Sequence, residues 1–402
     1  MMNTENMNGH RAGQYVRQLP GYRAFIPKPL PPHPPIQMDG EIQKLLSRAD
    51  RALGRLDGTT EILPNPDLFV AMYVRKEAVL SSQIEGTRAS LIDILEFESD
   101  AMVPDNPQDI AEVVNYIDAL NYGLQRLETL PVSLRLIREI HERLMANVRG
   151  ADKHPGEFRS TQNWIGHVGS TIETAKYVPP PVPDMKQALS DLEHFLHEDD
   201  TLPLLIKVGL VHAQFETVHP FLDGNGRMGR LLITFLLCKE GVLQRPLLYL
   251  SHFFKQNKQE YYEHLQRVRD EGDWESWLKF FLSGVGTVAQ QATYTARNIV
   301  RLRERDRNLI MEELGSSAGS ALRLLEHLYK RPVMNISRAA EILDRKYPNA
   351  SRIVMKLYEL GILVELTEKQ RNRMFMYDEY FNMLEQEPLL GETNASEGQE
   401  GI

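Results

Sequence analysis

The sequence contains very little cysteine, and no apolar run in it is long enough to span a bilayer. Its one cysteine, Cys238, lies in the apolar run 231–238, so no disulfide can form within the chain. A single thiol among apolar side chains is typical of packing and not of a nucleophile. The polar start of the chain also lacks the apolar segment of a signal peptide. We therefore expect a cytoplasmic protein with no membrane partner.

An excess of positive charge is also absent. The 402 residues include 46 Lys and Arg against 55 Asp and Glu, for a net charge of −9, so no overall field attracts nucleic acid. The hydrophobic share of 42% and the charged share of 25% are those of a globular protein and exclude a chain that is disordered throughout. The length allows two or three domains.

Helical periodicity dominates the middle of the chain, where apolar residues recur at three- and four-residue spacings. The expected helices are 39–56, 67–83, 91–98, 110–127, 131–147, 185–198, 202–218, 226–240, 258–271 and 274–313. The segment 155–183 breaks this pattern with β-branched and aromatic residues around glycines, which predicts a short β-hairpin. The predicted fold class is therefore all-α, mainly helical, with one short hairpin.

The two ends of the chain differ from this helical middle. Residues 1–26 show no regular pattern, and 27–35 (PKPLPPHPP) predict an extended polyproline strap. After a small-residue linker at 315–319, expected helices at 320–330, 337–343 and 347–360 precede expected strands at 361–364 and 373–377. This order predicts a C-terminal winged-helix domain.

These patterns predict the following domains: an extended Pro-rich N-terminal segment (1–36), an N-terminal helical region (37–130), a catalytic core (131–285), a connecting helix (286–314), a winged-helix domain (315–385) and a disordered tail (386–402). The winged-helix segment is locally basic, with Arg345, Lys346 and Arg352 at its expected recognition helix. Interspersed acidic residues dilute this patch, so DNA and a protein both stay open as its partner.

The chemistry of the chain is concentrated in residues 219–230 (HPFLDGNGRMGR). Glycines allow the backbone amides to turn toward one point, and the loop opens an expected helix whose free N–H groups favour phosphate. Arg227 and Arg230 stand on the first turn of that helix, which is unfavourable by roughly 0.3–1 kcal/mol unless an anion is bound. His219 can accept a proton near neutral pH, and Asp223 is a hard oxygen ligand suited to Mg²⁺.

These twelve residues match the HxFx(D/E)GNGRxxR signature at every defined position and thereby resemble the Fic family. The similarity extends from the Pro-rich segment to Phe281. Residues 155–159 (PGEFR) and 162–166 (QNWIG) resemble the flap of the family, and Tyr261 and Tyr262 with 272–274 resemble its nucleotide-side helix. The resemblance implies an α-helical enzyme that transfers AMP from ATP to Ser, Thr or Tyr hydroxyls of proteins, including its own.

The resemblance also implies a role for each matching position. His219 would be the catalytic base, and Asp223 would hold Mg²⁺. The nucleotide would be bound by Gly224, Asn225, Gly226, Arg227, Met228, Gly229, Arg230, Asn257, Tyr261 and Tyr262. The target flap would be formed by Asn163, Trp164, Ile165 and Gly166, which would pair with an extended target segment.

A second motif precedes the first. Residues 81–86 (SSQIEG) match the (S/T)xxxE(G/N) inhibitory motif of the family, with Ser81 first and Glu85 and Gly86 last. Glu85 stands at the end of an expected helix, where a carboxylate opposes the helix dipole and favours a cationic partner. The resemblance names Arg230 as that partner, at the place of the γ-phosphate of ATP. We therefore expect Glu85 to inhibit AMP transfer.

Several alternatives stay open. The same site could remove AMP from a modified protein, or use another nucleotide donor. His212, Glu216 and His219 lie at i, i+4 and i+7 of one expected helix, a spacing that could also hold a metal. The chain could act as a DNA-binding regulator, and the resemblance is compatible with a homodimer.

Overall fold

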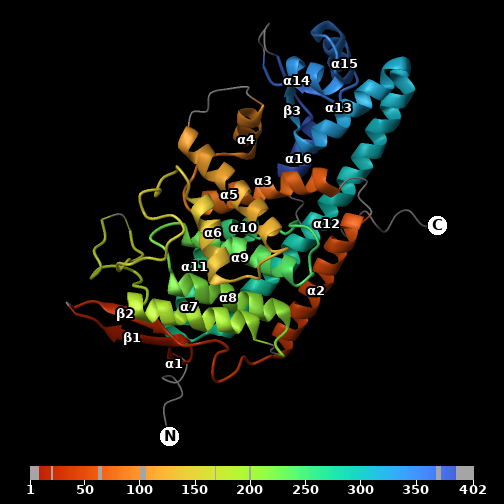
Figure 1. The fold of residues 1–402 in the computed structure, drawn as a ribbon. Coiled ribbons are helices and arrows are strands. Elements are labelled where there is room, and N and C mark those ends of the chain that lie inside the picture. Colours follow the sequence, from red (N-terminus) through yellow and green to blue (C-terminus); the bar gives the residue numbers. More distant parts are fainter. Residues whose placement is uncertain are drawn as a thin grey trace.

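The computed structural model describes residues 9–19, 21–61, 66–99, 106–167, 169–198, 201–367 and 373–385, and most of them are helical (Figure 1). The helices are α1 (Gly9–Ala12), α2 (Gly40–Glu61), α3 (Pro66–Ile84), α4 (Leu91–Glu98), α5 (Pro107–Arg126), α6 (Leu134–Leu144), α7 (Val182–His197), α8 (Leu204–Val218), α9 (Asn225–Lys239), α10 (Ser251–Gln256), α11 (Lys258–Glu271), α12 (Trp274–Glu313), η2 (Gly315–Ser317), α13 (Ala318–Lys330), α14 (Ile336–Leu343), α15 (Tyr347–Glu359) and α16 (Asp378–Glu385). The strands are β1 (Gly13–Arg17), β2 (Arg23–Pro27), β3 (Val333–Asn335), β4 (Val364–Glu365) and β5 (Met374–Met376).

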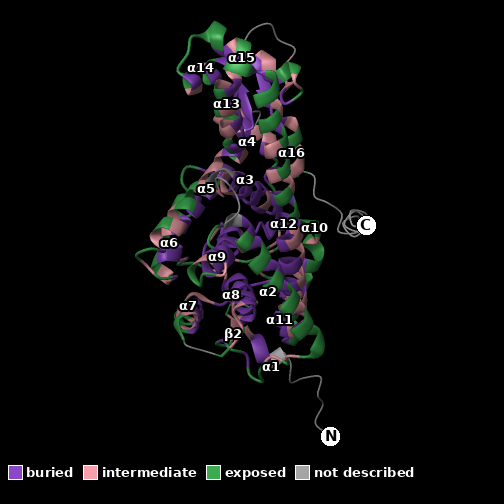
Figure 2. Cartoon of the chain, turned by 90° about the vertical axis from the view of Figure 1, so that its right-hand side faces the viewer, coloured by how far each residue is buried: buried purple, intermediate pink, exposed green. Residues whose placement is uncertain are grey.

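Helices α8 and α9 form the centre of the molecule. Nearly all their residues are buried, because apolar side chains occur on every side of both helices, as expected for helices enclosed by others. The 40-residue helix α12 runs beside α2 along one side of this pair (Figure 1). Helices α7 and α11 contact α8, while α5 and α6 contact α9. Figure 2 shows the resulting buried interior and the exposed outer faces. The loop between α8 and α9 is thus held at both ends by core helices.

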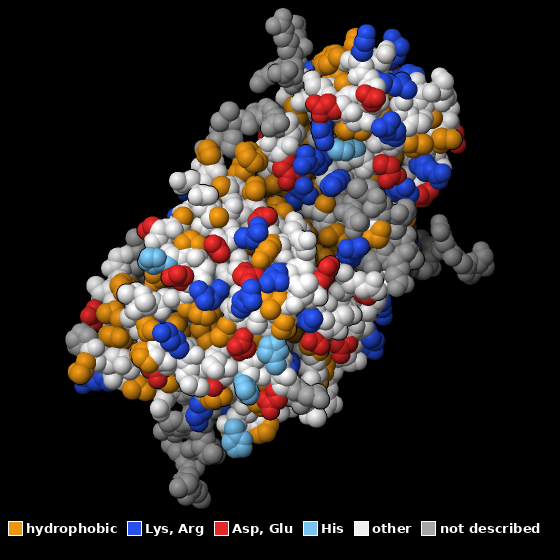
Figure 3. All heavy atoms as spheres, in the orientation of Figure 1, with side chains coloured by type: hydrophobic (Ala, Val, Ile, Leu, Met, Phe, Trp, Pro, Cys, Tyr) orange, Lys and Arg blue, Asp and Glu red, His pale blue; other side chains and the backbone are white. Residues whose placement is uncertain are grey.

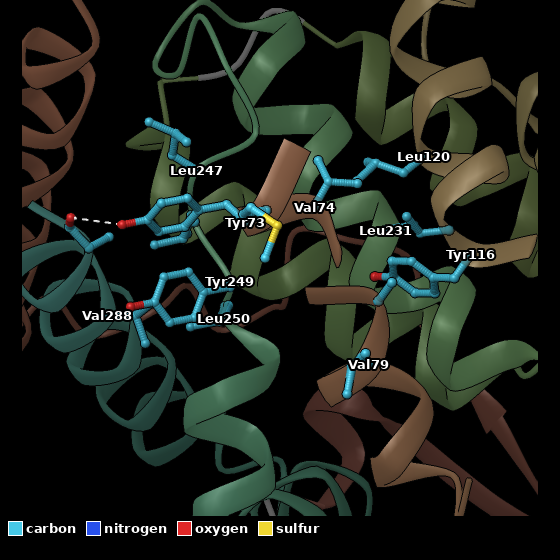
Figure 4. Close-up of a cluster of buried hydrophobic side chains, with 14 of the residues drawn as sticks. Tyr73, Val74, Val79, Tyr116, Leu120, Leu231, Leu247, Tyr249, Leu250 and Val288 are labelled. Atoms are coloured by element: carbon cyan, nitrogen blue, oxygen red, sulfur yellow. Dashed lines mark hydrogen bonds between the residues drawn. The ribbon is translucent and has the colours of Figure 1, made fainter. Parts of the chain in front are cut away.

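Helix α3 crosses the same core and carries the 81–86 motif at its C-terminal end. Its buried contacts appear in Figure 4, which labels Tyr73, Val74 and Val79 of α3, Tyr116 and Leu120 of α5, Leu231 of α9, and Val288 of α12. The Tyr73 hydroxyl donates to the carbonyl oxygen of Ala292 in α12, 3.3 Å away. Since α3 packs on both α5 and α9, its C-terminal end has a defined position next to the loop.

The C-terminal unit stands at the far end of α12 (Figure 1). It contains α13 to α16 and an antiparallel sheet with strand order β3-β5-β4. It packs on α3, where Phe69 and Tyr329 stack with ring centroids 5.9 Å apart and Lys76 Nζ donates to the carbonyl of Leu384 at 2.6 Å. The winged-helix domain was predicted from three helices followed by two strands, and it stays a prediction.

Two sequence-based expectations are wrong. The absence of regular structure before Pro27 is contradicted by the β1–β2 hairpin, which pairs Gly13 with Pro27 and Arg17 with Arg23. Two five-residue strands are marginal alone, and this hairpin is held by its contact with the flap, where the Phe25 amide donates to Val178 at 3.0 Å.

The second wrong expectation is the β-hairpin at 155–183. The described part of this segment contains a single antiparallel bridge, between Ile165 and Tyr177. Residues 179–181 are prolines and have no N–H to donate, so the second arm cannot extend the ladder. On its other edge, this second arm accepts from β2 through the carbonyl of Val178. Within the described residues, no helix combines the length and the apolar character that crossing a bilayer requires.

Candidate active site

The loop between α8 and α9 is closed by its own side chains. Helix α8 ends at Val218, and the next residue, His219, has a left-handed backbone with φ 47° and ψ 61°. Asn225 accepts from the amide of Phe221 and donates to its carbonyl, both at 2.8 Å. Phe221 is buried and stacks on His141 with ring centroids 3.6 Å apart. These contacts give the loop a single defined shape.

His141 supports this loop from α6. Its Nδ1 accepts from the amide of Gly156 at 2.9 Å, so its Nε2 carries the proton and donates to the carbonyl of Asp223 at 3.0 Å. Burial lowers the pKa of His141 to about 4, so the ring is neutral at physiological pH. The sequence offered no signal for this role, because His141 lies 78 residues or more before the loop it holds.

The start of α9 is open to an anion. Gly224 precedes the helix with φ 76°, and among the described residues no side chain caps this end. Instead, the carboxylate of Glu85 approaches it: a Cβ added at Gly226 would lie only 2.3 Å from Glu85 Oε1. Free amide groups and the helix dipole favour negative charge at such a position. Glu85 therefore lies where the chemistry of the loop favours a phosphate.

Arg230 connects this carboxylate to α3, as expected. Its Nη2 lies 2.7 Å from Glu85 Oε1 and 3.0 Å from the carbonyl of Ser81, and its Nε donates to Ser81 Oγ at 2.8 Å. The side chain of Arg230 is 2% exposed and that of Glu85 is 32% exposed. Gly86 follows with a positive φ of 105°, which allows the chain to leave α3 at this point. The two sequence motifs thus meet through Arg230.

His219 lines a cavity of about 340 Å³ together with Glu85, Gly226, Arg230, Tyr261 and Tyr262. Burial lowers the pKa of the His219 imidazole to about 4, and the nearby charges of Arg269 and Arg159 contribute in the same direction. The ring is therefore unprotonated at neutral pH and can accept a proton. Its Nδ1 is buried and has no hydrogen-bond partner within the described ranges.

Two buried carboxyl groups near Arg230 belong to neither of the two sequence motifs. Glu216 lines the cavity, and burial raises its pKa to about 7; its Oε1 has no partner among the described residues. A Cβ added at Gly229 would lie 2.6 Å from this oxygen, so glycine is needed there. Glu77 of α3 accepts from the hydroxyls of Ser251 and Tyr116, and burial raises its pKa to about 7 as well.

The alternative of a metal site at His212, Glu216 and His219 has no support. The two ring nitrogens of His212 lie 3.0 Å from the carbonyl of Gly229 and 2.8 Å from the hydroxyl of Tyr261. Both are therefore occupied by protein groups. The described part of the chain contains no cluster of three metal-ligating side chains.

Asp223 has the properties of a Mg²⁺ ligand that acts together with phosphates. Its Oδ1 accepts from the amide of Gly224 at 2.7 Å, and its Oδ2 lies 3.2 Å from Lys153 Nζ. The side chain is 34% exposed, so one face of the carboxylate is open. Mg²⁺ is typically held by one or two carboxylates together with substrate phosphates and water, and this single carboxylate beside the start of α9 fits that pattern.

Not every expected nucleotide ligand lies at the cavity. Arg227 is buried and points away, with its Nη1 3.2 Å from Glu112 of α5. Asn257 donates to the carbonyl of Phe253 at 2.9 Å and lines a separate surface hollow. Met228 is fully buried. Tyr262 and Tyr261 do line the cavity.

The flap lies over the loop. Ile165 exchanges two backbone hydrogen bonds with Tyr177, at 2.8 and 3.0 Å, which is its only ladder contact in the described chain. Asn163 Nδ2 donates to the carbonyl of Phe221 at 2.9 Å. Trp164 remains 44% exposed, and a Cβ added at Gly166 would meet Ser170 at 2.8 Å. The flap is thus anchored at Asn163 and exposes one edge near Trp164.

Comparisons with known proteins agree with this arrangement. Residues 43–125 match the family model "Fic/DOC family N-terminal", and residues 131–237 match the model "Fic/DOC family". A crystal structure of a Fic family protein from Desulfovibrio desulfuricans G20 has a similar fold, with a TM-score of 0.58 at 19% identity over 85% of this chain and 97% of that chain.

Two curated relatives are similar in sequence. A protein named "Protein adenylyltransferase Fic" from Drosophila grimshawi is 31% identical over 156 residues, which are 38% of this chain and 29% of that protein. A probable protein adenylyltransferase from Aquifex aeolicus is 31% identical over 181 residues, 44% of this chain and 51% of the relative. The chain thus matches less than a third of the first and about half of the second. With both model matches, the shared fold and the complete loop signature, residues 43–125 and 131–237 form an N-terminal and a main domain of the Fic/DOC family.

Proposed function

We propose that the protein transfers AMP from ATP to hydroxyl groups of proteins. One observation carries this proposal: an unprotonated His219, the open start of α9 and Arg230 face a single cavity. A base beside a site for phosphates is the combination that nucleotidyl transfer to a hydroxyl needs. The names of the curated relatives support the same reaction.

In the proposed reaction, His219 removes the proton from a Ser, Thr or Tyr hydroxyl. The hydroxyl oxygen forms a bond to the α-phosphorus of ATP, and the bond from that phosphorus to the bridging oxygen of pyrophosphate breaks. The amides at the start of α9 and the guanidinium of Arg230 stabilise the negative charge of the phosphates. Positioning and charge stabilisation account for most of the catalysis of such a step.

Asp223 would hold Mg²⁺, which when bound neutralises part of the charge of the phosphates. The target segment would bind to the flap. Because Ile165 uses its own N–H and C=O for Tyr177, the backbone groups of Trp164 and Gly166 point to the opposite edge. An extended target chain can pair with that edge, and this mode depends on the backbone more than on side chains.

We further infer that Glu85 inhibits this reaction. Its carboxylate lies against Gly226 and pairs with Arg230, so it competes with an anionic phosphate for the same guanidinium. ATP that binds while Glu85 is in place cannot bring its terminal phosphate to Arg230. Release of Glu85 would therefore permit the productive arrangement.

The test is incubation with Mg²⁺ and ATP labelled at the α-phosphate, using the parent protein, Glu85→Gly and His219→Ala. We expect covalent label on protein that increases in the Glu85 variant and disappears in the His219 variant. Absence of label on all three, with folding confirmed by circular dichroism, would refute ATP-dependent transfer. Assays with other nucleotides and with AMP-modified protein would then decide between another donor and AMP removal.

DNA binding by the C-terminal unit is a second candidate function. Arg345, Lys346, Tyr347, Asn349 and Arg352 are all exposed around the start of α15. Figure 3 shows Lys and Arg side chains gathered over this end of the molecule, with Asp and Glu between them. Such a surface suits phosphate contacts. Salt-sensitive retention of the whole protein on duplex DNA, reduced by Lys346→Ala and Arg352→Ala together, would support this candidate. No retention at low salt would refute it.

A further inference from the structure

Arg159 lies just before the flap, whose two arms are residues 161–166 and 177–181, and its guanidinium is buried. Its Nε donates to the carbonyl of His219 at 3.0 Å, its Nη1 to Thr161 at 3.3 Å, and its Nη2 to Pro180 at 2.5 Å. Its own amide donates to the carbonyl of Pro220 at 2.9 Å. One side chain therefore joins both arms of the flap, at 161 and 180, to the loop that begins with His219.

These acceptors are all neutral, and within the described residues no carboxylate pairs with Arg159. Burying a cation without a counter-charge is costly, so stability alone does not explain an arginine here. The guanidinium has a rigid planar fork of five donors, which lets one residue reach three carbonyls in different directions. A lysine at the same place has one terminal nitrogen and cannot span the same three groups.

The backbone of His219 requires such support. A left-handed conformation costs a residue other than glycine roughly 1–2 kcal/mol. It is maintained by the bond from Arg159 Nε, by a weaker bond from Asn163 Nδ2 to the same carbonyl at 3.4 Å, and by the His219 amide, which donates to Phe215 at 3.0 Å. The direction of the imidazole follows from this backbone.

We propose that Arg159 is a positioning residue that joins the flap and His219 into one rigid unit, so that a target segment paired with the flap presents its hydroxyl to the imidazole. The inference rests on the proposed transfer of AMP for its consequence in catalysis. Arg159 does not line the cavity and acts only through the backbone of His219, the flap arms and its charge.

The charge of Arg159 acts on the pKa of His219, so this pKa can be measured independently of the rate of labelling. The other charged or titratable groups around His219 are Glu85 after α3, Glu216 of α8, Arg230 of α9, Tyr261, Tyr262 and Arg269 of α11, and His167, Lys176 and Tyr177 of the flap. Burial is the main reason for the low pKa of His219, and Arg269 and Arg159 lower it further. Loss of the Arg159 charge should therefore raise this pKa, whereas loss of its geometry alone should not.

The experiment compares Arg159→Lys, which keeps the charge, with Arg159→Met, which removes it, both in the Glu85→Gly protein. Arg138→Lys is the matched control, because Arg138 also donates from Nε to a backbone carbonyl, that of Gly156 at 2.8 Å. It also lies over the ring of Phe158, 5.9 Å from the centroid, and in the described chain no hydrogen bond joins it to His219, Thr161 or Pro180. The readouts are the NMR titration midpoint of His219, the rate constant of self-labelling at saturating labelled ATP, and the KM for ATP.

We expect Arg159→Lys to lower the rate constant roughly 10–100-fold, the loss typical of a misplaced catalytic group, with the KM for ATP changed less than about twofold. The His219 midpoint should stay in place in Arg159→Lys and rise in Arg159→Met. Arg138→Lys should change none of these values.

A rate constant in Arg159→Lys equal to that of its Glu85→Gly background would overturn the inference. So would a decrease that only follows the folded fraction measured by circular dichroism. If no variant labels itself, the proposed function fails, and the NMR titration still tests the inference. A His219 midpoint and flap amide shifts that are unchanged in both Arg159 variants would then refute it.

Discussion

The substitution Glu85→Gln removes one charge from the inhibitory contact and leaves its shape almost unchanged. Glu85 lies just beyond the end of α3 at Ile84, so neither Gln nor Gly at this position interrupts a helix. The substitution weakens a hydrogen bond between two ions, 2.7 Å long, with Arg230 buried and Glu85 32% exposed. Hydrogen bonds to charged groups contribute about 1.5–3 kcal/mol, and the partial exposure of Glu85 places this one near the lower end.

About 1.4 kcal/mol corresponds to a tenfold change in an equilibrium constant. If Glu85 limits the fraction of enzyme with a productive phosphate at Arg230, Glu85→Gln should increase the labelling rate roughly tenfold. Glu85→Gly should increase it further, because it also removes the side chain that lies against Gly226. The assay is the initial rate of label transfer from ATP labelled at the α-phosphate, at saturating nucleotide.

Glu263→Gln is the matched control, since Glu263 lies on α11 at the separate hollow that Asn257 also lines, and its carboxylate accepts from Gln259 at 2.7 Å. It should leave the rate unchanged. The parent should also be activated by salt, because the exposed side of the Glu85–Arg230 pair is screened, whereas Glu85→Gln should not respond. Equal rates for the parent and both Glu85 variants would refute the inhibitory role of this contact.

Three further predictions concern the buried charges and the loop. Glu112→Ala should destabilise the protein by about 3–5 kcal/mol in urea unfolding, because it leaves Arg227 buried without a carboxylate partner. Glu139→Ala, which breaks a more exposed ion pair, should cost less than about 1 kcal/mol. Similar losses in the two variants would contradict the burial of the Glu112–Arg227 pair. The pKa of Glu216 is about 7 in the folded protein against 4.5 for the ordinary group, so its contribution to stability is full below pH 4.5 and is lost as the pH rises through 7. Glu216→Gln should therefore raise the free energy of unfolding at pH 8 by up to about 3 kcal/mol and change it little at pH 4.5. Equal effects at the two pH values would show that the Glu216 carboxyl is not buried. Asp223→Asn should raise the Mg²⁺ concentration needed for half-maximal labelling roughly tenfold or more, and an unchanged requirement would exclude Asp223 as a ligand.

Helices with a clear apolar period were predictable from the sequence. The expected helices at 91–98, 258–271 and 274–313 agree with α4, α11 and α12 at both ends. These helices could be predicted because the spacing of apolar side chains within each segment decides which face of the helix is buried. The β1–β2 hairpin and β3 were missed, because short strands are stabilised by distant partners such as Val178 and β5, and such partners leave no local pattern.

The same distinction applies to the flap. Its β-branched residues suggested a hairpin, but the ladder stops after one bridge because the second arm continues into prolines, which have no N–H to donate. Arg227 shows the opposite case. Its place in the loop motif suggested a phosphate ligand, and only the packing of α5 against α9 directs it to Glu112.

The sequence by itself determined the chemistry of the loop at 219–230, because its base, its glycines and its helix start are contiguous and need no distant residue to be recognised. It also determined the contact of Glu85 with Arg230, through two complete motifs. The tertiary structure alone decided which other groups surround His219 and Arg230. Glu77 and Arg159 are brought there by the packing of α3 and the flap, and burial shifts the pKa of both and of Glu216, which a linear sequence does not encode.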